Sequence, residues 1–133
     1  MSQETVELAR QVMDALSRRD LESLIDFADP EIEWHSFFAE LGEGGVYRGY
    51  DGTRRYMGDL NEAWEIVRAD VDDGVATGDV ALLVGRIHYR GKGSGAETES
   101  PAGWMLKFRN GKLLRFRAFR DPQGALEAAG LAE

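Results

Sequence analysis

The stretch AGWMLKFRNGKLLRFRAFRDP, residues 102–122, decides the fold class of this chain. Residues 102–109 and 112–120 are predicted to form two long strands, because β-prone residues recur in both runs. The runs meet at Asn110-Gly111, and both of these residues tolerate the positive φ of a type I′ turn. The stretch therefore predicts a β-hairpin that ends at Asp121-Pro122, followed by a short last helix.

Two helices are predicted at the start of the chain. Residues 4–18 carry apolar side chains at helical spacing on one face and charged side chains on the other. Asp20 is a candidate N-cap for a second, short helix. Asp29-Pro30 ends that helix, because the residue before a proline is pushed out of the α region.

The middle of the chain switches between helical and strand periods. Residues 32–38 alternate, with Trp34 on one face and His35 on the other, and indicate a strand. A third helix is predicted after it, with Asp51 as its cap. The apolar stripe of this helix consists of Tyr56, Leu60, Ala63, Trp64 and Val67.

The remainder before the hairpin is predicted to be β-structure. From about residue 66 apolar and charged residues alternate, Asp72-Asp73-Gly74 is predicted to turn, and residues 80–90 form a long strand. Helices lead and strands follow, so the predicted class is α+β with an antiparallel sheet.

Length, composition and charge limit the classes of function that this chain can have. The length of 133 residues predicts one domain, residues 1–133. The absence of cysteine excludes disulfides and thiolate nucleophiles and favours a cytoplasmic location. A formal net charge of −8 repels nucleic acid and anionic membranes. No apolar run approaches the roughly 20 residues that span a membrane, and the N-terminus reads as an acidic helix, so we expect no membrane partner and no export.

The order of these elements resembles the nuclear transport factor two-like superfamily, in its SnoaL-like and ketosteroid isomerase-related branch. The matching pieces span nearly the whole chain and are Arg19-Asp20-Leu21, Asp29-Pro30-Glu31-Ile32-Glu33-Trp34, Tyr47-Arg48-Gly49 with Asp51-Gly52, Asn110-Gly111-Lys112, and Phe119-Arg120-Asp121-Pro122. The resemblance implies a cone-shaped α+β domain with an internal pocket. Three N-terminal helices would pack on a strongly curved, mixed, mainly antiparallel sheet, with a short C-terminal helix.

The superfamily does not fix the chemistry, because one fold hosts many functions. On an ungapped pairing with ketosteroid isomerase, the base falls at or next to His35, the second carboxyl at about Trp104 and the tyrosine near Val12. Trp104 and Val12 cannot supply the acid and phenol that stabilise an enolate oxygen in that enzyme. Steroid isomerisation of that type is therefore disfavoured.

His35 and Asp121 are the candidate catalytic residues. His35 lies mid-strand among apolar residues and is suited to moving a proton near neutral pH, although a core histidine bonded to a backbone carbonyl is an equal alternative. Asp121 ends the last strand and is either a second acid–base group or the cap of the last helix. Arg117 either pairs with Asp121 inside the cavity or lies on the outer face with Arg115 and Lys107.

Aromatic residues are the candidate walls of a substrate pocket. They are Trp34, Tyr56, Trp64 and Trp104. His88 shares its strand face with two arginines and is expected at the surface or an interface. The glycine-rich segments 42–45 and 91–95 fit no nucleotide-binding pattern, and the histidines lack metal-ligand spacing. We therefore expect neither cofactor nor metal.

Two functions of different class follow from these residues. The first is a small-molecule enzyme acting on an apolar, cyclic or polyketide-like substrate by cofactor-free acid–base chemistry, as a cyclase, isomerase or epoxide hydrolase. The second is a non-catalytic module that binds a hydrophobic ligand or dimerises. We also expect a homodimer: if Asp121 faces the cavity, Leu114, Phe116 and Ala118 face outward and need a partner.

Overall fold

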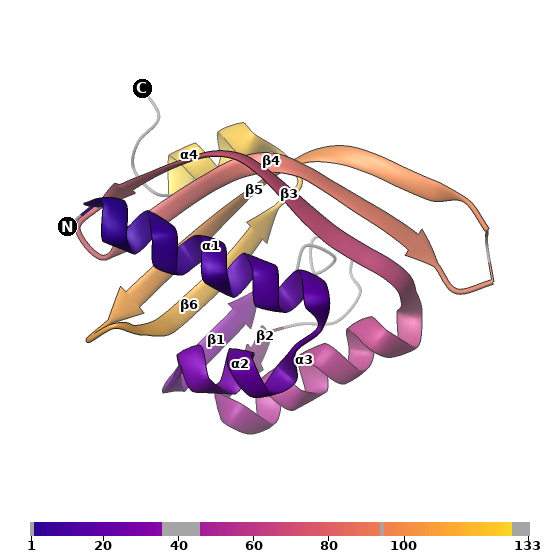
Figure 1. Ribbon diagram of the computed structural model, residues 1–133, viewed down its shortest axis with the longest axis horizontal. Helices are drawn as coiled ribbons and strands as arrows, with labels where there is room; N and C mark the ends of the chain where they lie inside the picture. The colour runs from indigo at the N-terminus through magenta and orange to yellow at the C-terminus, as the bar shows by residue number, and fades with distance from the viewer. Residues whose placement is uncertain (1, 36–45, 94, 129–133) are drawn as a thin grey trace.

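The computed structural model describes residues 2–35, 46–93 and 95–128 (Figure 1). Within these residues four helices pack on one curved sheet of six strands. In chain order the elements are α1 (Ser2–Arg18), α2 (Leu21–Phe27), β1 (Ala28–His35), β2 (Val46–Arg48), α3 (Gly49–Ala63), β3 (Trp64–Thr77), β4 (Val80–Gly91), β5 (Glu97–Arg109), β6 (Lys112–Phe119) and α4 (Pro122–Ala128).

The sheet is mixed and mainly antiparallel, as predicted. Its strand order is β2-β1-β6-β5-β4-β3, and only the β1–β6 pair among these described strands is parallel. α1 crosses the concave side of the sheet and packs on β3 and β4, α3 packs on β1, and α4 packs on β5 (Figure 1). The α+β class and the arrangement of helices on a curved sheet are therefore confirmed. No helix within the described residues is long and apolar enough to cross a membrane.

Two local predictions hold in detail. Asn110 and Gly111 have φ values of 52° and 77°, and Arg109 lies opposite Lys112, so the dipeptide forms the predicted hairpin turn. Asp20 caps α2, because its carboxylate accepts a hydrogen bond from the backbone N of Ser23 at 3.1 Å. These signals act within a few residues, so distant contacts do not override them.

The third helix is shorter than predicted. It ends at Ala63, and Trp64 and Val67 belong to β3 instead. Their spacing fits a helix, but pairing with β4 from the first residue of β3 takes precedence. Asp51 is not the cap, because the helix begins at Gly49; Asp51 lies in the first turn and pairs with Arg54 at 2.8 Å.

Asp72-Asp73-Gly74 does not turn the chain. β3 runs on to Thr77, and the register shift between Val71 and Asp73 marks a β-bulge. The partner strand carries Gly85 at this place, where an added Cβ would lie 2.0 Å from the carbonyl oxygen of Asp70. The extra residue is therefore absorbed inside one long, bent strand.

The boundaries of β1 and β2 also differ from the sequence prediction. β1 begins at Ala28 rather than residue 32, and residues 36–38 of the predicted strand lie outside the described residues. β2 is a three-residue strand that the sequence pattern did not reveal. The alternation of β1 is as predicted: Ile32 and Trp34 are fully buried, while Glu33 and His35 lie on the other face and are half-buried.

The two faces of β6 point in the directions opposite to those that the dimer hypothesis assumed. Phe116 and Ala118 are buried in the main core, whereas Arg115 and Arg117 are exposed on the outer face. The expectation that Phe116 and Ala118 face outward is therefore wrong, because side chains of α1 and α3 lie over that face. Association of two chains stays a prediction, without the apolar patch on which it rested.

Candidate functional site

A closed apolar cavity lies between the helices and the concave face of the sheet. Its volume is about 30 Å³, which is room for a water molecule. Ser17 and Tyr56 supply its hydroxyl groups. The other lining residues are Met13, Leu16, Leu60, Val67, Ala69, Ile87, Trp104, Phe116 and Ala118.

An open groove of about 840 Å³ runs outside the cavity, between α1 and β3. That volume lies in the range of small-molecule binding sites. Met13, Ser17, Val67 and Ala69 line both the groove and the cavity. These four residues therefore form the wall that separates the closed apolar space from the open one.

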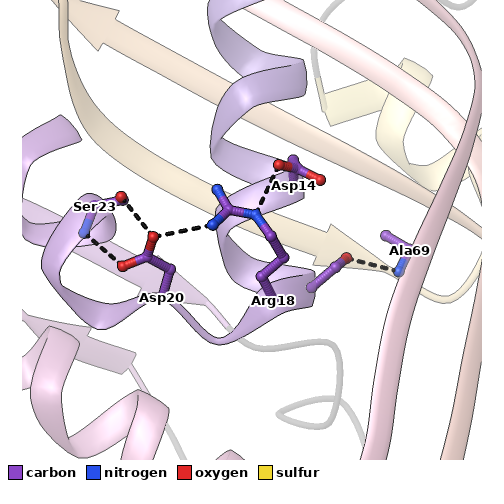
Figure 2. Close-up of polar contacts among 6 residues, drawn as sticks. Asp14, Arg18, Asp20, Ser23 and Ala69 are labelled. Atoms are coloured by element: carbon purple, nitrogen blue, oxygen red, sulfur yellow. Dashed lines mark hydrogen bonds and ion pairs between the residues drawn. The ribbon is translucent and has the colours of Figure 1, made fainter.

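Ser17 joins the two sides of this wall. The backbone N of Ala69 donates to Ser17 Oγ at 3.1 Å, and Figure 2 shows this bond running from α1 to the facing strand. β3 is the edge strand of the sheet, so the hydroxyl satisfies a donor that has no neighbouring strand on that side. Among the described residues Ser17 Oγ only accepts, and its own proton is available to a ligand oxygen.

Arg19 lies where α1 ends. Arg19 N donates to Leu16 O and Asp20 N to Ala15 O, the pair of bonds that defines a Schellman motif. The motif puts Arg19 at φ 58°, in the left-handed region, where glycine is preferred and another residue costs roughly 1–2 kcal/mol.

The Arg19 side chain is partly buried and lines the groove. Its Nη1 donates to Asn61 Oδ1 on α3 at 2.8 Å. Its Nη2 is buried and has no hydrogen-bond partner within the described part of the chain. Burial lowers the pKa of this guanidinium, which is nevertheless charged at neutral pH.

The carboxylates of the groove already have cationic partners. Figure 2 shows Arg18 between Asp14 and Asp20, at 2.9 and 3.0 Å. Glu65 pairs with Arg90 at 2.7 Å, and Asp70 with Arg68 at 3.6 Å. Arg19 forms no ion pair with any described residue.

The predicted aromatic wall is only partly in place. Tyr56 and Trp104 line the cavity, whereas the fully buried Trp34 lies behind them, 5.3 Å from the Tyr56 ring centroid. Trp34 Nε1 donates to Thr53 Oγ1 at 2.7 Å, and Thr53 donates to the carbonyl of Gly49, so this buried group is satisfied. Trp64 is half-buried outside the described cavity lining and packs edge-on against Tyr89 at 5.3 Å.

His35 lies on the face of β1 opposite the buried Trp34. Its Nε2 is 3.1 Å from Glu33 Oε1, and Arg115 and Arg48 approach the same carboxylate at 3.6 and 3.7 Å. The hydrogen bond from His35, assisted by the two arginines, lowers the pKa of Glu33. His35 is therefore part of a charged cluster on the outer face of the sheet, and it is not in the described lining of the cavity.

Asp121 and Arg117 also lie outside the cavity lining that the structure describes. Asp121 is exposed, and its Oδ1 accepts from the backbone N of Gln123 at 3.0 Å, as a helix cap does. Arg117 is exposed and its guanidinium lies 4.7 Å from the ring centroid of Phe119. No hydrogen bond or ion pair joins His35 to Asp121 among the described residues.

Sequence reasoning overlooked Ser17, Arg19 and Asn61. Ser17 follows Met13 by four residues on the buried stripe of α1, so a polar group on an apolar face was the available signal. The Arg19–Asn61 contact spans 42 positions and had no local signal. Within the described residues no group of three histidine or carboxylate side chains is arranged to hold a metal ion.

The fold is shared with several solved structures. An NTF2-like protein from Burkholderia pseudomallei is 18% identical, with a TM-score of 0.77 over 94% of this chain and 96% of that one. A protein from Shewanella denitrificans, named after SnoaL-like polyketide cyclases, is 19% identical, with a TM-score of 0.72 over 94% and 95%. An LEH-like epoxide hydrolase from M. tuberculosis is 10% identical, with a TM-score of 0.73 over 96% and 90%. At these identities the likeness concerns the fold.

Family membership rests on sequence. No curated protein matches the chain. The profile of the SnoaL-like domain matches residues 9–116, which include α1 from Ala9 on, the residues that line the groove and most of the hairpin. The chain therefore belongs to the SnoaL-like domain family.

Proposed function

We propose that this protein is a small-molecule enzyme that converts an apolar, cyclic or polyketide-like substrate by cofactor-free acid–base chemistry. One observation carries the proposal: a closed apolar cavity and an open groove of ligand size share the wall formed by Met13, Ser17, Val67 and Ala69. The substrate lies in the groove and inserts its apolar part once this wall parts. The family and the neighbours named after cyclases and epoxide hydrolases support an enzyme over a passive module.

The hydroxyl of Ser17 has a specific role in this proposal. It lies at the boundary of groove and cavity and has a proton to donate, so it holds a carbonyl or epoxide oxygen of the substrate. The apolar walls around that oxygen exclude water, which strengthens the bond as charge develops. Cyclisation, isomerisation and epoxide opening all place developing charge on such an oxygen.

The proposal is tested with a panel of alicyclic and aromatic ketones and epoxides incubated with the protein and analysed by mass spectrometry. Cofactor-free acid–base chemistry gives a product of unchanged mass or one heavier by a water molecule. Binding is followed in parallel with N-phenyl-1-naphthylamine, an uncharged fluorescent probe of apolar sites. We expect the probe to bind and at least one compound to be converted.

A variant whose cavity is filled by a larger side chain tests whether this cavity is the substrate site. Ala118 lines the cavity and is buried, so Ala118→Val fills a space of about 30 Å³. Ala76→Val makes the same change in β3, outside the described cavity lining, and is the control. We expect Ala118→Val to remove conversion and weaken probe binding, with Ala76→Val unchanged. Probe binding without conversion of any compound would leave a binding module, and conversion that survives Ala118→Val would place the site elsewhere.

A further inference from the structure

In the part of the chain that the structure describes, Arg19 lacks the counter-charge that Arg18 and the carboxylates of the groove have. The carboxylates of the groove each pair with a neighbouring arginine, and Arg18 is held between two carboxylates (Figure 2). Arg19 is partly desolvated, and only the neutral amide oxygen of Asn61 bonds it within the described residues. A partly buried cation without a counter-charge is unfavourable unless something else supplies the charge.

The backbone conformation of Arg19 is a second indication that this position has a function. Its left-handed conformation is one that glycine adopts without cost, yet the chain places an arginine there. Strained residues that persist tend to mark sites of function. The position directs a guanidinium toward α3, where Asn61 fixes one nitrogen and leaves the buried Nη2 without a partner.

From these observations we infer that Arg19 binds an anionic oxygen of the ligand, a carboxylate or an acidic enol, whose apolar body enters the cavity beside Ser17. A planar guanidinium can donate hydrogen bonds to two separate oxygens or to the two oxygens of one delocalised anion. The inference rests on the proposed ligand cavity and adds the class of ligand: an apolar ring system that carries one acidic group. Nη2 is buried, so a ligand reaches that atom after a small movement of the side chain.

A matched pair of probes separates the two parts of this inference. 1-Anilinonaphthalene-8-sulfonate carries an anionic group on the same ring system as the uncharged N-phenyl-1-naphthylamine. Fluorescence titration of both probes gives two dissociation constants, and their ratio measures the contribution of the charge. We expect the native protein to bind the anionic probe at least tenfold more tightly than the uncharged one.

Three variants locate that contribution. Arg19→Gly removes the guanidinium and suits the left-handed backbone. The melting temperature should therefore stay the same or rise, while the affinity for the anionic probe should fall about tenfold. Arg19→Lys keeps the charge without the planar fork and should retain part of the preference. Arg120→Gln removes an exposed cation outside the described linings of the groove and the cavity, and should leave the preference unchanged.

Each outcome bears on a different claim. If both probes bind equally to the native protein, or if Arg120→Gln weakens the anionic probe as much as Arg19→Gly does, the specific role of Arg19 is overturned while the ligand cavity stands. If neither probe binds, the proposed cavity fails and this inference fails with it. Asn61→Ala tests the positioning role of the amide: it should lower the preference for the anionic probe and leave the uncharged probe unaffected.

Discussion

The concave and convex faces of the sheet differ most clearly along β6. On the concave side, Phe116 and Ala118 are buried and line the cavity under α1. On the convex side, Arg115 approaches Glu33, and Arg117 covers the ring of Phe119. The difference separates two kinds of residue that the sequence presents side by side: the cavity is lined mostly by apolar residues, whereas His35 and Arg117 lie on the other face and Asp121 is exposed beyond the end of β6.

The convex face has its own small core. Leu82, Phe119 and Ala125 form it beneath α4, with Met105 packed alongside. Gly103 lets α4 approach the sheet, because an added Cβ would lie 2.7 Å from the Cβ of Ala125. The short helix therefore shields part of a face that is otherwise occupied by charged residues, and Asp121 acts where that helix begins.

The largest expected effect comes from truncating one side chain on each face of β6. Phe116→Ala leaves a cavity in the main core and should lower the free energy of unfolding by about 3–5 kcal/mol. Arg117→Ala removes an exposed cation–π contact and should cost about 1 kcal/mol or less. Urea unfolding monitored by tryptophan fluorescence measures both. Equal losses would contradict the assignment of the two faces.

A smaller loss is expected from the buried polar pair behind the cavity. Thr53→Val keeps the shape but leaves Trp34 Nε1 without its acceptor, at a cost of about 1–3 kcal/mol. Thr77→Val changes an exposed position of β3 and should stay within about 0.5 kcal/mol of the native protein. The same urea titration compares the two variants. A neutral Thr53→Val would mean that the indole finds another acceptor.

Local chemistry explains which features the sequence predicted. The Asn110-Gly111 turn, the Asp20 cap and the alternation of β1 each depend on neighbouring residues, and they are confirmed. The end of α3 and the course of β3 depend on pairing with β4, which no local pattern carries. Trp64 illustrates the ambiguity, since its spacing suits the helical stripe and also the start of a strand.

Less of the candidate site than of the fold could be predicted from the sequence. Tyr56 and Trp104 were predicted wall residues and do line the cavity. His35 and Asp121 have the right chemistry for catalysis, but His35 lies on the face of β1 opposite the buried Trp34, and Asp121 lies beyond the end of β6 at the start of α4. Ser17 and Arg19 become notable only when α1, α3 and β3 are seen together. Their roles come from tertiary contacts rather than from a motif.

Asp121 and His35 provide the next test. Asp121→Ala should lower the free energy of unfolding by about 1 kcal/mol through the lost cap, whereas Asp121→Asn keeps an acceptor and should be nearly neutral. Neither variant, nor His35→Ala, should change the affinity for N-phenyl-1-naphthylamine, because none of these side chains is in the described cavity lining. Thermal unfolding and probe titration measure the two effects. Loss of substrate conversion by a well-folded Asp121→Asn or His35→Ala would restore the acid–base pair indicated by the sequence.

The smallest effect concerns a charge pair at the start of β1. The backbone N of Glu31 and the guanidinium of Arg109 both bond Asp29, at 2.8 and 2.9 Å, and they lower the pKa of its carboxyl in that order of importance. A carboxyl whose pKa is lower in the folded state stabilises the fold above its unfolded pKa of about 4, and this contribution is lost as the pH falls through the folded value. The melting temperature of Asp29→Asn should therefore lie below that of the native protein at neutral pH and converge with it as the pH falls below about 4. Arg109→Gln should remove only part of the difference, because the Glu31 backbone bond remains. If the difference in melting temperature between the native and Asp29→Asn proteins widened toward low pH, this coupling would have the opposite sign. The Asp29 carboxylate would then not stabilise the fold.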